Sequence, residues 1–180
     1  FRSAALTSLV KILADPLSEL PAITFWLLGG LSDVTWRDLP LLLLITGVGS
    51  AFLYAVRWQL NVLSLGDREA AALGLNTRQM KLLVVGVASL LTAAAVAVGG
   101  VIGWVGLVIP HAGRLLVGPD HRRLLPVSLS LGAAFLLVID TLARAALPRE
   151  VPLGVFTGIV GVPVLFLLLR RSRGGAGWTE

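Results

Sequence analysis

Residues 39–98 read LPLLLLITGVGSAFLYAVRW, QLNVLSLGDREAAALGLNTRQMK and LLVVGVASLLTAAAVAV, two long apolar runs on either side of a charged segment. A hydrocarbon core about 30 Å thick is crossed by roughly 20 mainly apolar residues in a helix. We therefore expect membrane spans at residues 39–58 and 82–98. The charged segment between them is expected to form a short helical hairpin in water.

The composition of the whole chain supports a membrane protein. Apolar residues make up 56% of its 180 residues and charged residues 14%, and the mean hydropathy is +0.89. The apolar share and the hydropathy are above those of soluble domains, and the charged share is below. We expect an all-α integral membrane protein, a polytopic bundle of about five spans with short interfacial and cytoplasmic helices, as one transmembrane domain over residues 1–180. With no cysteine and two histidines, no metal site and no cofactor are expected.

The other apolar segments complete the expected bundle. The segment GGVIGWVGLVIPHAGRLL at 99–116 indicates a tight reversal and a short span that Pro110 kinks or ends. Further spans are expected at 124–146 and 153–169. Before the first full span, an interfacial helix and loop carry Trp26 and Trp36. These rings either lie at the headgroup level or pack between helices.

Basic residues are distributed unevenly between the two sides of this topology. The side of the charged hairpin carries Arg57, Arg68, Arg78, Lys81, Arg114, Arg122, Arg123, Arg170, Arg171 and Arg173. The other side carries Arg2, Lys11, Arg37, Arg144 and Arg149 and is richer in acids. The positive-inside rule therefore places the hairpin and the C-terminus in the cytoplasm. The basic charge is explained by orientation, and no nucleic-acid partner is expected.

The source of energy for any transport is also constrained by the sequence. No charged residue lies near the middle of an expected span, which disfavours intrinsic coupling to protons or sodium. The chain has no G-x-x-x-x-G-K-[ST] phosphate-binding loop. If ATP drives the protein, a separate subunit must hydrolyse it, and this chain is not itself an enzyme.

The hairpin has the pattern of a short, capped helix. Asp67 and Glu69 fall in its first turn, where acids favour the positive end of the helix dipole, and Gly74 is placed to end it as a C-cap. One interpretation is a solvated connector between two spans. The other is a surface for a soluble partner, because Leu65, Leu73 and Leu75 stay exposed unless something covers them.

Several blocks of the chain resemble one family. LGDREAAALGL, the long segment GGVIGWVGLVIPHAGRLLVGPDHRRLLPVSLSLGAAFLLVIDTLAR and VPLGVFTGIVGVPVLFLLLR are similar to the permeases of ABC importers for ferric siderophores, haem and vitamin B12. The resemblance implies a ten-span subunit of the cytoplasmic membrane, of which this chain would be the end of span five and spans six to ten. It would act as a dimer, with a second copy or a paralogue.

The resemblance also implies partners and a cargo. The partners are a cytoplasmic ATP-binding subunit, an extracytoplasmic substrate-binding protein and membrane lipid. A ferric siderophore is the preferred cargo because that class is the most numerous, and haem and cobalamin are the alternatives. The rival hypothesis is a polytopic membrane protein outside the ABC class, either a secondary carrier or a scaffold.

Residues that match family motifs receive expected roles. The ATPase-coupling segment is Gly66, Asp67, Arg68, Glu69, Ala72, Leu73 and Gly74. Arg144, and less strongly Arg149, are expected to dock the binding protein, although Asp140 and Arg144 could instead form a local i,i+4 pair.

The last span contributes the expected translocation path, formed by Gly154, Thr157, Gly158 and Gly161. Its glycines would also allow close helix packing. His111 is expected to be a structural anchor rather than a ligand.

Overall fold

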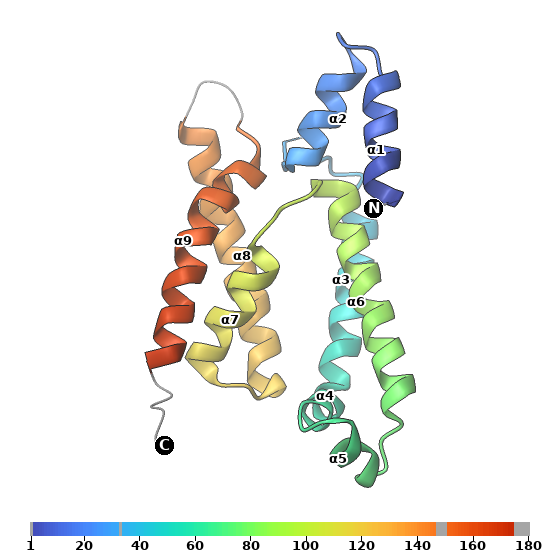
Figure 1. Ribbon diagram of the computed structural model, residues 1–180, viewed down its shortest axis with the longest axis vertical. Helices are drawn as coiled ribbons and strands as arrows, with labels where there is room; N and C mark the ends of the chain where they lie inside the picture. The colour runs from blue at the N-terminus through green and yellow to red at the C-terminus, as the bar shows by residue number, and fades with distance from the viewer. Residues whose placement is uncertain (1, 33, 147–150, 175–180) are drawn as a thin grey trace.

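The computed structural model describes residues 2–32, 34–146 and 151–174, and within these ranges all regular structure is helical (Figure 1). In chain order the helices are α1 (Arg2–Leu13), α2 (Glu19–Leu28), α3 (Leu39–Ala55), α4 (Arg57–Leu63), α5 (Asp67–Ala72), α6 (Thr77–Gly99), α7 (Val105–Val117), α8 (His121–Ala146) and α9 (Leu153–Gly174). The expected all-α class is confirmed.

The helices differ in their capacity to cross a bilayer. By length and composition, α6 and α8 can each do so alone, and α3 with α4 makes a third candidate if the bent pair counts as one span. The apolar part of α9 (Leu153–Leu168) and α7 are shorter. Because α7 has 13 residues and a helix rises about 1.5 Å per residue, it covers only about two thirds of a hydrocarbon core.

The first expected span is broken near its end. A single helix was expected over 39–58, but α3 ends at Ala55 and α4 leaves at an angle of 59°. Arg57 stabilises this bend, because its Nη1 donates to the carbonyl oxygen of Tyr54 at 2.8 Å and its guanidinium lies 4.3 Å from the centre of the Tyr54 ring. The charged hairpin therefore begins with a helix.

The third expected span is helical only in its second part. Residues 100–104 are not helical and connect α6 to α7, with Gly100 at φ 66° and Trp104 at φ 68° (Figure 1). Of the two expected effects of Pro110, ending the helix is wrong, since α7 continues from Val105 through Pro110 to Val117, and a kink stays a prediction. The interruption is caused by the left-handed backbone before α7.

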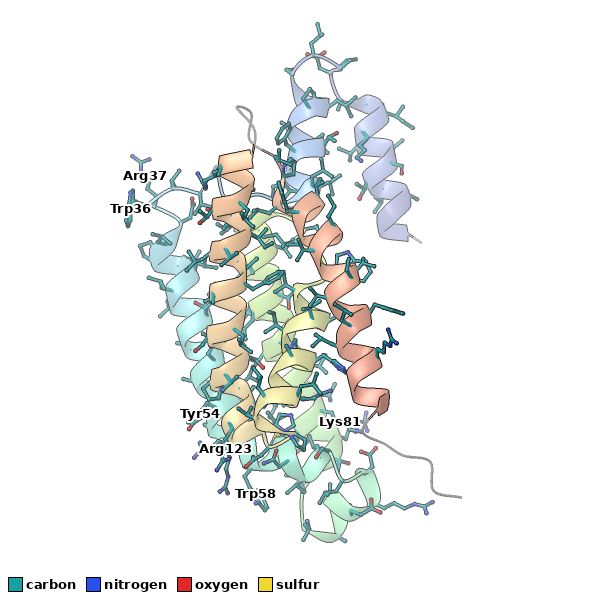
Figure 2. All side chains as sticks on the ribbon, turned by 90° about the vertical axis from the view of Figure 1, so that its left-hand side faces the viewer. Trp36, Arg37, Tyr54, Trp58, Lys81 and Arg123 are labelled. Atoms are coloured by element: carbon teal, nitrogen blue, oxygen red, sulfur yellow. The ribbon has the colours of Figure 1, made fainter. Side chains whose placement is uncertain are left out.

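The molecule has two distinct ends. Tyr54, Trp58, Lys81 and Arg123 lie at the end that carries α4 and α5, and Trp36 and Arg37 lie at the other (Figures 1 and 2). Near the second end, Ile139, Ala143 and Leu153 form a buried cluster where α8 meets the start of α9. The bundle therefore holds two sets of polar residues apart.

Candidate functional site

The start of α5 requires glycine at position 66. Gly66 has φ 119°, which side chains rarely adopt, and a Cβ atom there would lie 2.6 Å from Oε2 of Glu69. Asp67 and Glu69 occupy the first turn of α5, as expected from the sequence. This glycine allows the chain to turn sharply out of α4 and start a second helix after three residues.

The end of α5 is a Schellman motif around Gly74. The Gly74 N–H donates to Ala71 at 2.9 Å, the Leu75 N–H donates to Ala70 at 3.1 Å, and Gly74 has φ 82°. The expected C-cap is confirmed. Asn76 then starts α6, because its Oδ1 accepts the Gln79 N–H at 3.1 Å. Both ends of the connection to α6 are thus fixed by hydrogen bonds.

One side of α5 is attached to the bundle. Ala70 is fully buried, and both carboxylate oxygens of Asp67 accept from Nζ of Lys81 in α6, at 2.5 and 2.7 Å. The two side chains are largely exposed, so this ion pair contributes little stability in water. Its effect is geometric, since it ties the first turn of α5 to α6.

The opposite side of α5 faces outward. Arg68, Glu69 and Ala72 are exposed, and Leu73 and Leu65 are 58% and 62% exposed. A surface of two leucines, an alanine and charges of both signs suits a protein partner better than lipid chains. The structure thus brings the seven expected coupling residues together in one short element.

A hydrogen-bonded cluster of Asn61, Asp120 and His121 holds α4 against the start of α8. Asn61 accepts the His121 N–H at 2.9 Å through Oδ1 and donates to Oδ1 of Asp120 at 2.6 Å. The same Asp120 oxygen accepts the Arg122 N–H at 3.0 Å, as an N-cap of α8 does. The Arg122 N–H and the Asn61 amide lower the pKa of Asp120 by stabilising its carboxylate.

This cluster was not predicted from the sequence. A polar Asn61 within the otherwise largely apolar WQLNVL and an Asp directly before α8 were signals, but nothing local joins residues 59 or 60 positions apart. Its consequence is that the hairpin is fixed to α8 as well as to α6.

The expected docking residue Arg144 lies at the other end of the molecule. Its Nε donates to Oδ2 of Asp140 at 2.8 Å, so the local i,i+4 pair considered as the alternative is present. Both residues border a pocket of 420 Å³ whose lining also includes Trp26, Gly100 and Leu153. Arg149 lies outside the described residues.

The expected path residues of α9 pack against this chain itself. A Cβ atom at Gly154 would lie 2.2 Å from the Leu28 carbonyl oxygen, and one at Gly161 would lie 2.6 Å from Cβ of Trp104. Thr157 is fully buried and donates to the carbonyl oxygen of Gly154 at 3.1 Å. Close packing of this helix is therefore confirmed. A path along these residues would require the contacts of Gly154 with Leu28 and of Gly161 with Trp104 to open.

Three polar atoms are buried without a hydrogen-bond partner within the described chain. They are Nε2 of His111, Oε1 of Gln59 and Oγ of Ser128. Ser128 lies close to Gly113 of α7, where a Cβ atom would be 3.0 Å from its Oγ. His111 lies inside α7 near this contact in sequence, and its role as an anchor remains a prediction.

The fold defines a class, a polytopic helical membrane protein with a short exposed helix, α5, at one end. The FecCD transport family model matches residues 1–171. The chain belongs to the FecCD transport family.

Individual relatives agree with this assignment. The chain is 38% identical over 173 residues to the molybdate import system permease protein MolB of Haemophilus influenzae, covering 96% of this chain and 51% of that protein. It is 47% identical over 152 residues to the cobalamin import system permease protein BtuC of Halobacterium salinarum, covering 84% and 41%. The chain thus spans about half the length of the curated relatives it matches.

A solved structure shares the fold. It is described as an inward-facing conformation of a metal-chelate type ABC transporter, and it matches with a TM-score of 0.90 and 38% identity over 93% of this chain and 55% of that one. The helix arrangement described above therefore matches that of an ABC transporter permease.

Proposed function

We propose that this chain is the membrane-spanning part of an ATP-binding-cassette importer permease, and that its hairpin receives a separate ATP-binding subunit. The observation that carries the proposal is the two-sided α5. Its inner side is fixed to α6 through Asp67, and its outer side presents Ala72 and Leu73. Membership of the FecCD transport family supports it.

The hairpin would transmit movement mechanically. When two ATP-binding subunits close on nucleotide, a helix held in a cleft of one of them is displaced with it. That displacement reaches α6 through the Asp67–Lys81 pair and reaches α8 through Asn61. No side-chain chemistry in this chain is needed, which is consistent with the lack of a phosphate-binding loop.

The two ends of the molecule indicate where the other proposed subunits would bind. The hairpin end is cytoplasmic by its excess of basic residues. The opposite end, where α8 ends after Arg144, faces outward and docks a substrate-binding protein. A second permease copy or a paralogue completes the translocation path. The α9 residues Gly154, Thr157, Gly158 and Gly161 contribute to it once their contacts with Leu28 and Trp104 open.

We further propose a metal chelate or a related cofactor as the cargo, with a ferric siderophore first. Relatives named for iron chelatin, iron(3+)-hydroxamate and hemin support this choice, and relatives named for cobalamin and molybdate define the competitors. The path residues of this chain are apolar or small, which suits a bulky chelate whose own groups hold the metal.

The test is uptake into proteoliposomes that contain the complete transporter. Labelled ferric siderophore, haem, cobalamin and molybdate are each added outside the vesicles, with and without ATP enclosed in the vesicle lumen, which corresponds to the cytoplasm. The proposal predicts ATP-dependent accumulation of one class, dependent on an added binding protein. Accumulation driven by a proton or sodium gradient without ATP would contradict it and would favour a secondary carrier.

A further inference from the structure

Aromatic and basic side chains gather on one face at the hairpin end of the bundle. Tyr54 and Trp58 are 45% and 49% exposed, and Arg122 and Arg123 are exposed as well. Figure 2 shows Tyr54, Trp58 and Arg123 at this end, with Lys81 on the other side of the bundle. With Arg57 between the two aromatic residues, these five residues are here named the basic–aromatic patch.

The patch is assembled by tertiary structure. Asn61 joins α4 to Asp120 and His121. This hydrogen-bonded cluster holds Arg122 and Arg123 near α4, which carries Arg57 and Trp58. The guanidinium of Arg57 is fixed by its contacts with Tyr54. An arginine that is already ordered loses little conformational freedom when it binds an anion.

Asp120 offsets part of the positive charge of the patch, because its carboxylate attracts Arg122 and Arg123, but the patch has three arginines against this one acid. The ion pairs found within the described ranges are Lys81–Asp67 and Arg144–Asp140, and neither involves the patch. Asp120 is the nearby acid, and its Oδ1 accepts from Asn61 and from the Arg122 N–H. The guanidinium groups of Arg57, Arg122 and Arg123 retain N–H donors for an external anion, and phosphate oxygens match their fork geometry.

The surroundings of the patch are those of a membrane interface. Tyrosine and tryptophan prefer the headgroup level of a bilayer. On α8, Leu129 follows Arg122 by two helical turns and is 61% exposed, so an apolar surface for acyl chains continues from the arginine toward the middle of the span. A soluble phosphate compound would leave that apolar surface uncovered.

We propose that the basic–aromatic patch binds the phosphate headgroup of an anionic phospholipid in the leaflet at the hairpin end. The three arginines contact the phosphate, Tyr54 and Trp58 flank the glycerol region, and the acyl chains lie along α3 and α8. The lipid bridges the bend between α3 and α4 and the start of α8, next to the elements that carry the hairpin.

Native mass spectrometry of the full-length natural protein in detergent tests the proposal, with phosphatidylglycerol and phosphatidylcholine as the added lipids. We expect preferential binding of phosphatidylglycerol. Neutralising one arginine at an anionic lipid site weakens binding about fivefold, so Arg122→Gln should do so and the Arg122→Gln, Arg123→Gln pair should weaken it about 25-fold. The matched control is Arg37→Gln, an exposed arginine beside Trp36 at the opposite end, which should leave the affinity unchanged.

Three results would overturn the proposal. The first is equal loss of phosphatidylglycerol in the control and the patch variants. The second is full displacement of the lipid by an equimolar amount of soluble glycerol phosphate, which would show that a free phosphate compound is sufficient. The third is efficient crosslinking of Arg123→Cys to another protein subunit in membranes, which would show that protein covers the patch. Unchanged melting temperatures of the variants establish that they are folded.

Discussion

Asn61 in α4 and His121 at the start of α8 are joined across 60 residues of sequence, with the His121 N–H donating to Oδ1 of Asn61 at 2.9 Å. Because the same side chain also donates to Asp120, a single residue fixes the hairpin to a helix that is far away in the chain. The proposed transmission of movement and the proposed lipid site both depend on this connection.

Replacement of this asparagine tests the connection directly. Asn61→Ala leaves the His121 N–H without its acceptor, and we expect it to lower the free energy of unfolding by about 1 kcal/mol. Ser64→Ala, in the same segment, removes only an exposed hydrogen bond to the Asn61 carbonyl oxygen and is the control. Thermal unfolding in detergent measures both. Equal melting temperatures for the two variants would contradict a structural role for Asn61.

The packing of α9 on Trp104 gives a second prediction. A methyl group at Gly161 would lie 2.6 Å from Cβ of Trp104, whereas one at Gly158 would lie 3.8 Å from its Nε1, an ordinary contact. We expect Gly161→Ala to destabilise the protein by about 1–3 kcal/mol through overpacking. Gly158→Ala should be neutral or slightly stabilising, since alanine favours helix. The opposite order of melting temperatures would show that Trp104 does not pack on α9 in this way.

The C-cap of α5 gives a third prediction. Gly74 has φ 82° but no atom within 4 Å of a built Cβ, so substitution there costs backbone strain and no steric clash. Alanine should cost about 1–2 kcal/mol, and asparagine, which adopts this conformation more readily, should cost less. Hydrogen exchange at the α5 amides measures the local opening. Slower exchange in Gly74→Ala than in Gly74→Asn would be inconsistent with the left-handed cap.

Arg144 and Asp140 test docking at the opposite end. If Arg144 attracts an acidic residue of the binding protein, Arg144→Glu should weaken capture about tenfold and Asp140→Asn should leave it unchanged or stronger. The second change removes the competing carboxylate of the i,i+4 pair. Affinity for the loaded binding protein is the readout. If both variants bind with wild-type affinity, Arg144 is not part of the docking surface.

Much of the fold could be predicted because its signals are local. The apolar runs at 39–58 and 82–98, the acids in the first turn of α5 and the C-cap at Gly74 depend on residues within a few positions of each other. The hairpin could therefore be identified as a candidate site before any tertiary contact was known.

The features that were not predicted depend on distant partners. The attachment of α4 to α8 needs Asn61 to meet Asp120 and His121, and the short α7 needs a left-handed Trp104 that packs against glycine on α9. Proline was expected to interrupt α7, but the interruption occurs before it, where Gly100 and Trp104 set the backbone. No local periodicity contains this information.

Crosslinking from the hairpin tests the central claim, that α5 receives the ATP-binding subunit, most directly. In the assembled transporter, Ala72→Cys and Leu73→Cys lie on the exposed side of α5, and Trp36→Cys, also exposed, is the control at the opposite end. We predict efficient crosslinks to the ATP-binding subunit from both hairpin positions, changed in yield by ATP, and none from position 36. Assembly and transport without a crosslink from either hairpin position would contradict the proposed coupling.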